Sequence, residues 1–98
     1  MGSARERPAR LAEKLLQIRT APGLSQGEML HRIGLGETGY RHYVSHFETG
    51  SREPSLLILL EYARTANVYV EVLIDDGLDL PAKLPSAKKH EGVRRRGK

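Results

Sequence analysis

Glycine and proline residues break this sequence into short segments, and their spacing constrains the fold more than any other feature. The main breaks stand at Pro22-Gly23, between Gly34 and Gly39, at Gly50, at Pro54 and at Gly77. Proline cannot continue the hydrogen-bond ladder of a helix, and glycine favours the left-handed turn that ends one. Between the breaks, apolar residues recur with a helical period. We therefore expect an all-α fold, a compact bundle of about five short helices.

Two helices are predicted before the central glycine-rich segment. In residues 9–20, leucine and isoleucine recur at the i, i+4, i+7 spacing of an amphipathic helix, and Pro8 suits its first turn. Ser25 is followed three residues later by Glu28, which is the spacing of a capping box. This pair predicts a second helix that begins after Ser25 and ends near Ile33.

A third helix is predicted from about residue 40 to Glu48, and its two faces differ in chemistry. At about 100° per residue, the aromatic and apolar side chains, including Tyr43, fall on one side. The opposite side carries only hydrogen-bonding or cationic groups: Arg41, His42, Ser45, His46 and Thr49. Solvated helix faces usually mix both charge signs, so a face without a carboxylate favours a polyanionic partner. Glu48 falls at the boundary of the two faces.

A fourth helix is predicted from Ser55, a suitable N-cap, to about Ala66. Its inward face is expected to comprise Leu56, Leu59, Leu60 and Ala63. Leu57 and Ile58 are then surplus to a single core. They are expected to lie under another segment or to form a contact between subunits.

Residues 68–76 have two structural interpretations. Val68, Val70, Val72 and Ile74 alternate as in a β-strand, and β-branched residues favour strands. The same residues suit a short fifth helix with Val70, Leu73 and Ile74 inward. A strand would have to pair with its copy in a dimer, because no second strand is predicted. Both interpretations give the segment a role in assembly.

Positive charge is concentrated at the two ends of the chain, although the net charge is only +4. Residues 1–10 carry three of the 16 Lys and Arg residues, and residues 83–98 carry seven. The middle of the chain is acidic. We expect a flexible basic arm (residues 1–8), a folded domain (residues 9–78) and a basic disordered tail (residues 79–98).

Several classes of function are disfavoured by composition. The absence of cysteine rules out disulfides and thiolate metal sites. His42 and His46 have the spacing of a helical metal-binding pair, but no third ligand is evident nearby. We therefore predict no metal, no cofactor and no enzymatic activity. No apolar run approaches the roughly 20 residues that cross a bilayer, and a signal-peptide core is lacking, so a cytoplasmic location is expected.

Four short sequence words, and then the pattern Leu59-Leu60-x-x-Ala63, follow one another within residues 9–76. The four words are Leu24-Ser25-Gln26-x-Glu28, Ile33-Gly34, Val44-Ser45-His46-Phe47-Glu48-x-Gly50 and Arg52-x-Pro54-Ser55-Leu56. Their order and spacing resemble the lambda-repressor-like, XRE-type helix-turn-helix family of DNA-binding regulators. The resemblance implies that the second and third helices form the helix-turn-helix, with the third in the major groove of duplex DNA.

The resemblance also implies roles for individual positions. Base reading falls on Arg41, His42 and His46, and Ser45 lies on the same predicted helix face. Phosphate contacts fall on Gln26 and Arg52. We also expect phosphate contacts from Ser25, Tyr40 and Thr49. Arg19 and Glu48 match the positions of an ion pair that joins the first and third helices and holds the recognition helix in place.

Three features depart from the family pattern. The turn before the third helix is longer, and residues 36–39 have the character of an insertion. Leu30 stands where the family usually has a small residue packed against the third helix. We hypothesise that the longer turn makes room for Leu30. Tyr69 stands where family members often have a serine-like cap for the fifth helix.

The expected function is sequence-specific binding of double-stranded DNA by a transcriptional regulator, most often a repressor, associated with the bacterial nucleoid. We expect a homodimer, with contacts at Leu57, Ile58, Val70, Val72 and Ile74. One alternative is an antitoxin-like regulator that also binds a partner protein. Another is a protein- or RNA-interaction module built on the same fold.

Overall fold

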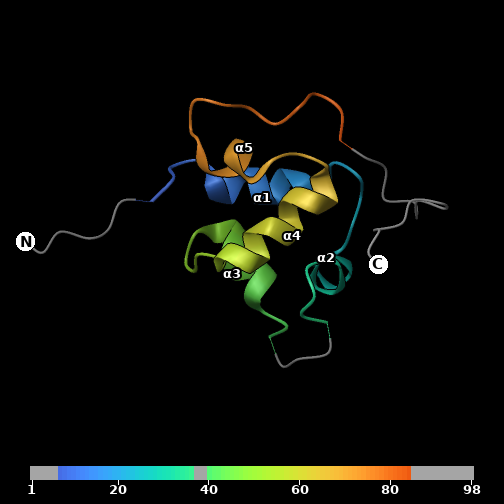
Figure 1. Cartoon of the computed structure of the whole chain (residues 1–98). Coiled ribbons are helices and arrows are strands. Elements are labelled where there is room, and N and C mark those ends of the chain that lie inside the picture. Colours follow the sequence, from blue (N-terminus) through green and yellow to red (C-terminus); the bar gives the residue numbers. More distant parts are fainter. Residues whose placement is uncertain (1–6, 37–39, 85–98) are drawn as a thin grey trace, which may run out of the picture.

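A computed structural model of the chain describes residues 7–36 and 40–84. These residues form the helices α1 (Leu11–Thr20), α2 (Gln26–Arg32), α3 (Tyr43–Thr49), α4 (Leu56–Ala66) and α5 (Val70–Ile74), shown in Figure 1. None of the described residues lies in a β-strand, which confirms the all-α class. Most of the predicted arm and tail, and residues 37–39 of the extended turn, lie outside the described residues. Among the helices described, none is long and apolar enough to cross a membrane.

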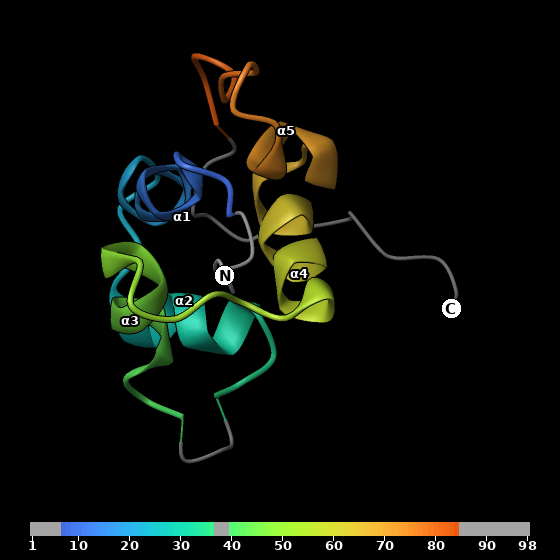
Figure 2. The ribbon, with the colours of Figure 1, turned by 90° about the vertical axis from the view of Figure 1, so that its left-hand side faces the viewer.

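The helices pack around a central pair, α1 and α4. Helices α2 and α3 contact one another and pack against α4 and α1, respectively, whereas α5 packs against both α1 and α4. Both ribbon views place α5 at the end of the molecule opposite the connection between α2 and α3 (Figures 1 and 2). The described part of the α2–α3 connection therefore lies away from α5.

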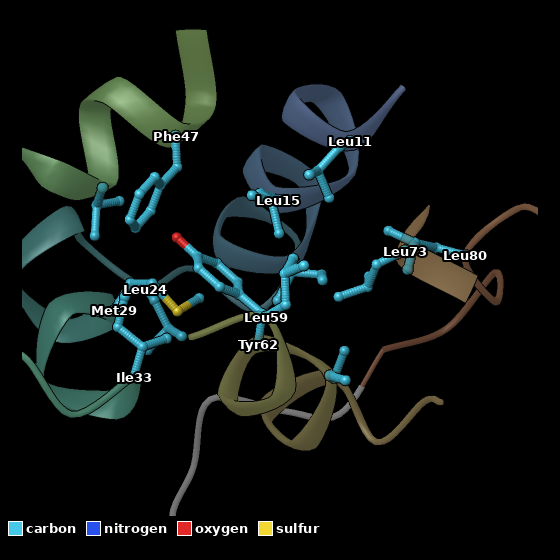
Figure 3. Packing of buried hydrophobic residues seen from close by; sticks show 14 of the residues in the cluster. Leu11, Leu15, Leu24, Met29, Ile33, Phe47, Leu59, Tyr62, Leu73 and Leu80 are labelled. Carbon is cyan, nitrogen blue, oxygen red and sulfur yellow. The ribbon is translucent and has the colours of Figure 1, made fainter. Parts of the chain in front are cut away.

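Tyr62 of α4 lies fully buried at the centre of the core (Figure 3). Its ring and that of Phe47 from α3 meet edge to face, with ring centroids 6.3 Å apart. All five helices contribute to the same apolar cluster, whose most buried members include Leu15, Ile18, Met29, Ile33, Val44, Tyr62 and Leu73. One continuous core thus fixes the position of α3 relative to the other helices.

The inward face of α4 is rotated from the predicted one. It consists of Leu59, Tyr62, Ala63 and Ala66, which keep the i, i+3, i+4, i+7 spacing. The prediction that Leu56 points inward is wrong, because this side chain is 81% exposed. Ile58, predicted to be surplus, is half-buried and packs against the core. Tyr62, which the predicted inward face left out, takes a fully buried position.

Side-chain caps set the starts of α2 and α4. Ser25 Oγ accepts a bond from Glu28 N at 3.0 Å, and Ser25 N donates to Glu28 Oε1 at 2.7 Å, so the predicted capping box is present. Two interactions with Ser25 hold the pKa of the Glu28 carboxyl below its usual range. The larger effect comes from the bond to the backbone N–H and the smaller from the hydroxyl. Ser55 Oγ accepts from Ile58 N at 3.3 Å, as predicted for the start of α4.

The start of α1 depends on a residue distant in sequence. Asp76 accepts bonds from the backbone N–H groups of Ala9 (2.8 Å) and Arg10 (3.0 Å). Arg10 is the N-cap and makes no side-chain capping bond. The predicted start near residue 9, with Pro8 in the first turn, is therefore too early: α1 begins at Leu11 because a carboxylate from beyond α5 satisfies the preceding N–H groups.

The strand interpretation of residues 68–76 is wrong, because α5 occupies this segment. Leu73 is buried and Val70 half-buried, as the helical interpretation required, but Ile74 is exposed. Lys14, itself buried, donates from Nζ to the carbonyl oxygens of Val72 (2.8 Å) and Asp75 (3.1 Å). A lysine of α1 thus supplies the C-terminal cap of α5.

Ordered contacts continue past residue 78, where the predicted domain ended. Leu80 is buried in the core, and Arg10 forms an ion pair with Asp79 at 2.8 Å. The Asp79 carboxylate is the main cause that raises the pKa of the Arg10 guanidinium. The segment after α5 therefore packs on the start of α1.

Candidate nucleic-acid interface

Helix α3 begins at Tyr43, later than the predicted start near residue 40. The Tyr43 N–H donates to Tyr40 O at 2.9 Å, which closes a turn and not an α-helical ring. The helical ladder starts with His46 N, which donates to His42 O at 3.1 Å. Arg41 and His42 therefore lie immediately before the first turn of α3, and His42 is the N-cap without a side-chain bond.

The predicted base-reading residues gather at the start of α3. Arg41, His42 and His46 are exposed, and Ser45 is half-buried. The imidazole rings of His42 and His46 have centroids 6.4 Å apart, so the two histidines are neighbours on one surface. The opposite side of the helix is anchored, because Val44 and Phe47 are buried.

Glu48 is directed away from this surface and into an ion pair with Arg19. Arg19 Nε donates to Glu48 Oε2 at 2.6 Å, and Nη2 donates to Oε1 at 3.1 Å. The Glu48 side chain is only 6% exposed. Arg19 Nη1 also donates to Leu24 O at 3.0 Å, so the same guanidinium contacts the loop before α2. The one carboxylate of α3 therefore does not add negative charge to the outward surface.

Gln26 connects α2 to this ion pair. Its Nε2 atom donates to Glu48 Oε1 at 3.2 Å. An amide nitrogen carries two hydrogens, so this bond leaves the second one for another acceptor. Glu48 therefore orients the amide of Gln26, a residue that the sequence places among the phosphate contacts.

Arg41 and Gln26 line the same open depression. It lies between the start of α2 and the segment before α3, and its lining also includes Ser25 and His31. The fold thus brings a predicted base-reading residue next to two predicted phosphate contacts. The ring of His31 occupies the space that a side chain at Gly36 would need. Sequence reasoning did not single out His31, which has no motif of its own.

Three further predicted phosphate residues lie near Tyr43 or the end of α3. Tyr40 stacks on Tyr43 with ring centroids 4.6 Å apart, and Arg52 lies over the Tyr43 ring at 4.3 Å. Thr49 Oγ1 donates to His46 O at 3.2 Å. Gly50 then ends α3 in the left-handed conformation, with φ of 83°, and turns the chain toward Arg52.

Arg7 is a residue near α3 that sequence reasoning missed. Its Nη1 atom donates to Gly50 O at 3.3 Å, which brings the Arg7 side chain beside the end of α3. Arg7 and Arg52 line one hollow there, together with Phe47. No local pattern predicts this contact, because the two partners are separated by 43 residues.

Leu30 is buried in the core, and α2 and α3 are in contact. The hypothesis that the longer turn makes room for Leu30 stays a prediction, because residues 37–39 lie outside the described part of the chain.

The predicted dimer residues differ in exposure. Leu57 is 73% exposed and Ile74 is also exposed, whereas Ile58, Val70 and Val72 are half-buried against the core. Leu56 and Tyr69 are the most exposed of the other large apolar side chains among the described residues, and neither was predicted as a dimer contact.

These features define a helix-turn-helix protein in which α2 and α3 form the motif and the start of α3 carries exposed cationic and polar groups. The chain is 32% identical to the restriction-modification controller protein C.AhdI from Aeromonas hydrophila, over 63% of this chain and 88% of that one, with a TM-score of 0.54. It therefore belongs to the lambda-repressor-like, XRE-type helix-turn-helix family of DNA-binding regulators.

Two other solved structures have the same fold. The hypothetical transcription factor NHTF from Neisseria is 27% identical, over 72% of this chain and 84% of that one, with a TM-score of 0.57. The LexA repressor from Eubacterium rectale is 17% identical, over 97% of this chain and 93% of that one, with a TM-score of 0.61, and shares the fold alone. No family model and no curated protein sequence matches the chain.

Proposed function

We propose that the protein is a sequence-specific transcriptional repressor that binds duplex DNA as a homodimer, with the start of α3 in the major groove. The observation that carries this proposal is the segregation of charge on α3. Arg41, His42 and His46 are exposed, whereas Glu48 is paired with Arg19. A helix surface that carries donors, and whose own carboxylate is turned away into an ion pair, suits base edges and phosphates.

Arg41 is the principal base-reading residue in this proposal. Its guanidinium can donate two parallel bonds to guanine O6 and N7, the most frequent specific contact in the major groove. His42 and His46 lie on the same surface and contact neighbouring base edges. Gln26 and Arg52 contact phosphates on either side and set the register of α3 on the duplex.

A homodimer would bury the exposed apolar residues of α4 and α5. Leu56 and Leu57 begin α4, and Tyr69 precedes α5; together they present large apolar side chains to solvent. Two copies of α3 would then lie about one helical turn of DNA apart, and the bound operator would be a pseudo-palindrome. The same exposed residues favour the alternative in which a partner protein, as in an antitoxin-like regulator, covers α4.

Direct titration tests the proposal. The full chain is titrated with a duplex DNA pool, with the single strand and with duplex RNA, each at several salt concentrations. We expect preferential binding to duplex DNA that weakens steeply with salt. Arg41→Ala should lose roughly 1–3 kcal/mol of binding to the preferred sequence. The matched control is Arg64→Ala, whose arginine pairs with Glu61 on α4. Equal effects of the two substitutions, or preference for RNA, would contradict the proposal.

A further inference from the structure

Arg52 is held against α3 through both its backbone and its side chain. The backbone N–H of Arg52 donates to His46 O at 3.2 Å, and the guanidinium lies 4.3 Å from the centroid of the Tyr43 ring. Both partners belong to α3, although Arg52 itself lies in the loop after the helix. An exposed arginine at this position would otherwise sample many rotamers, so the stacking restricts where its charge can be.

Tyr43 is in turn connected to the core by a series of ring contacts. Tyr43 meets Phe47 edge to face at 5.8 Å, and Phe47 meets Tyr62 in the same way at 6.3 Å. Tyr62 is fully buried. The Tyr43 ring therefore has a fixed position in the fold, and the guanidinium stacked on it takes its position from the core.

The Arg52 guanidinium lies over the Tyr43 ring, and a contact through its flat face keeps its hydrogen-bonding capacity intact. A guanidinium contacts an aromatic ring through its flat face, whereas its N–H donors lie in its plane and point outward. The same geometry suits two parallel bonds to a phosphate. Tyr43 can therefore orient Arg52 without competing for the anion.

We propose that Tyr43 is a positioning residue for a DNA-phosphate contact made by Arg52. This inference rests on the proposed function and adds a determinant of affinity that makes no base contact. It assigns the role to the face of the Tyr43 ring and not to its hydroxyl. Tyr40 stacks on the Tyr43 ring, with centroids 4.6 Å apart and an interplanar angle of 20°, and so contributes to holding that ring in place.

A double-mutant cycle on a selected duplex site tests the inference. Tyr43→Leu should weaken binding by roughly 2- to 5-fold, the range for an exposed cation–π contact. Arg52→Ala should weaken it further and reduce the magnitude of the salt slope by about one. In the Arg52→Ala background, Tyr43→Leu should have no additional effect. Tyr43→Phe, which keeps the ring, should bind within about twofold of the wild type.

The outcomes separate the two proposals. If the wild-type chain binds no duplex DNA, the proposed function fails. If it binds and the effects of Tyr43→Leu and Arg52→Ala simply multiply, this inference alone is wrong. If Tyr43→Phe loses as much affinity as Tyr43→Leu, the hydroxyl contacts DNA and the assigned role is wrong.

A measurement on the free protein tests the same contact without Tyr43→Leu, in case that variant does not fold. The ring current of Tyr43 should shift the side-chain proton resonances of Arg52 upfield in the wild type and in Tyr43→Phe. Random-coil shifts for Arg52 in the folded wild-type chain would overturn the inference without any substitution.

Discussion

At the scale of single residues, the orientation of the Glu48 carboxylate determines whether the exposed face of α3 carries negative charge. Glu48 lies at the boundary of the two helix faces in the sequence, and in the fold it accepts bonds from both Arg19 and Gln26. A carboxylate at this place on the exposed surface would repel phosphates. Its burial with Arg19 leaves Arg41, His42 and His46 as the charged and polar groups at the start of α3.

Tyr62 provides a residue-scale prediction about stability. Its hydroxyl is buried with no hydrogen-bond partner among the described residues, and burial, with Glu48 nearby, raises its pKa. A buried unpaired hydroxyl destabilises the fold, so Tyr62→Phe should increase the free energy of unfolding by about 1 kcal/mol. Urea unfolding should show a higher midpoint at an unchanged m value. Tyr69→Phe, at an 82% exposed position, is the control and should change nothing. A lower midpoint for Tyr62→Phe would show that the hydroxyl has a partner.

Asp76 predicts a specific dependence of stability on pH. Bonds from the N–H groups of Ala9 and then Arg10 hold its pKa below the ordinary value of 3.8. Because the folded-state pKa is depressed, Asp76 stabilises the fold above the unfolded-state pKa, and this contribution is lost as pH falls through the folded-state pKa. Asp76→Asn should therefore lower the melting temperature above about pH 5. The difference in melting temperature between the variant and the wild type should shrink as the pH is lowered. A difference that stays constant down to about pH 2 would contradict the role given to the charge.

At the scale of helices, contacts between residues distant in sequence determine the helix starts and the secondary structure that local patterns do not predict. The sequence correctly predicts α2 and α4 because Ser25 and Ser55 cap their own helices. It misplaces the start of α1 because the capping carboxylate, Asp76, comes from beyond α5. It leaves residues 68–76 ambiguous because their helical form depends on packing of Leu73 and on the Lys14 cap. Local propensity cannot register either contact.

The ion pair between α1 and α3 predicts a large effect for one carboxylate. Glu48→Ala should destabilise the fold by about 3 kcal/mol, because it leaves the Arg19 guanidinium without its partner in a largely buried position. Glu61→Ala removes the exposed carboxylate that pairs with Arg64 at 3.0 Å and should cost at most about 0.5 kcal/mol. Denaturant unfolding of both variants measures the difference. Similar decreases in the free energy of unfolding would show that the Arg19–Glu48 pair stabilises the fold no more than a surface ion pair does.

At the scale of the whole molecule, α5 and the α2–α3 connection lie at opposite ends (Figures 1 and 2). The family and the all-α class could be predicted from the order of short motifs in the sequence. The exposed face of α3 could also be predicted, because Arg41, His42 and His46 are exposed as the helical period indicates. The exposed face of α4 could not, because it depends on how the helix is rotated about its axis. In α4, Leu56 was predicted to point inward but faces solvent, whereas Tyr62, which the predicted inward face left out, is fully buried.

Assembly supplies a prediction at this scale. Leu57→Glu places a charge on the exposed apolar surface at the start of α4 and should convert a dimer into a folded monomer, because a charge cannot be buried there without a partner. Sedimentation equilibrium measures the mass, and circular dichroism checks the fold. Leu16→Glu, on the exposed side of α1, is the control and should leave the dimer intact. A wild-type chain that is already monomeric at high concentration would contradict the homodimer.

The central claim is that the start of α3 reads the sequence of duplex DNA. Selection of bound duplexes from a random pool, performed in parallel with the wild type and Arg41→Ala, tests it most directly. We predict that the wild type enriches a two-fold symmetric motif with half-sites about one helical turn apart, and that Arg41→Ala loses the preference at one base pair of each half-site. An identical motif for both proteins, or no enriched motif for the wild type, would contradict the claim.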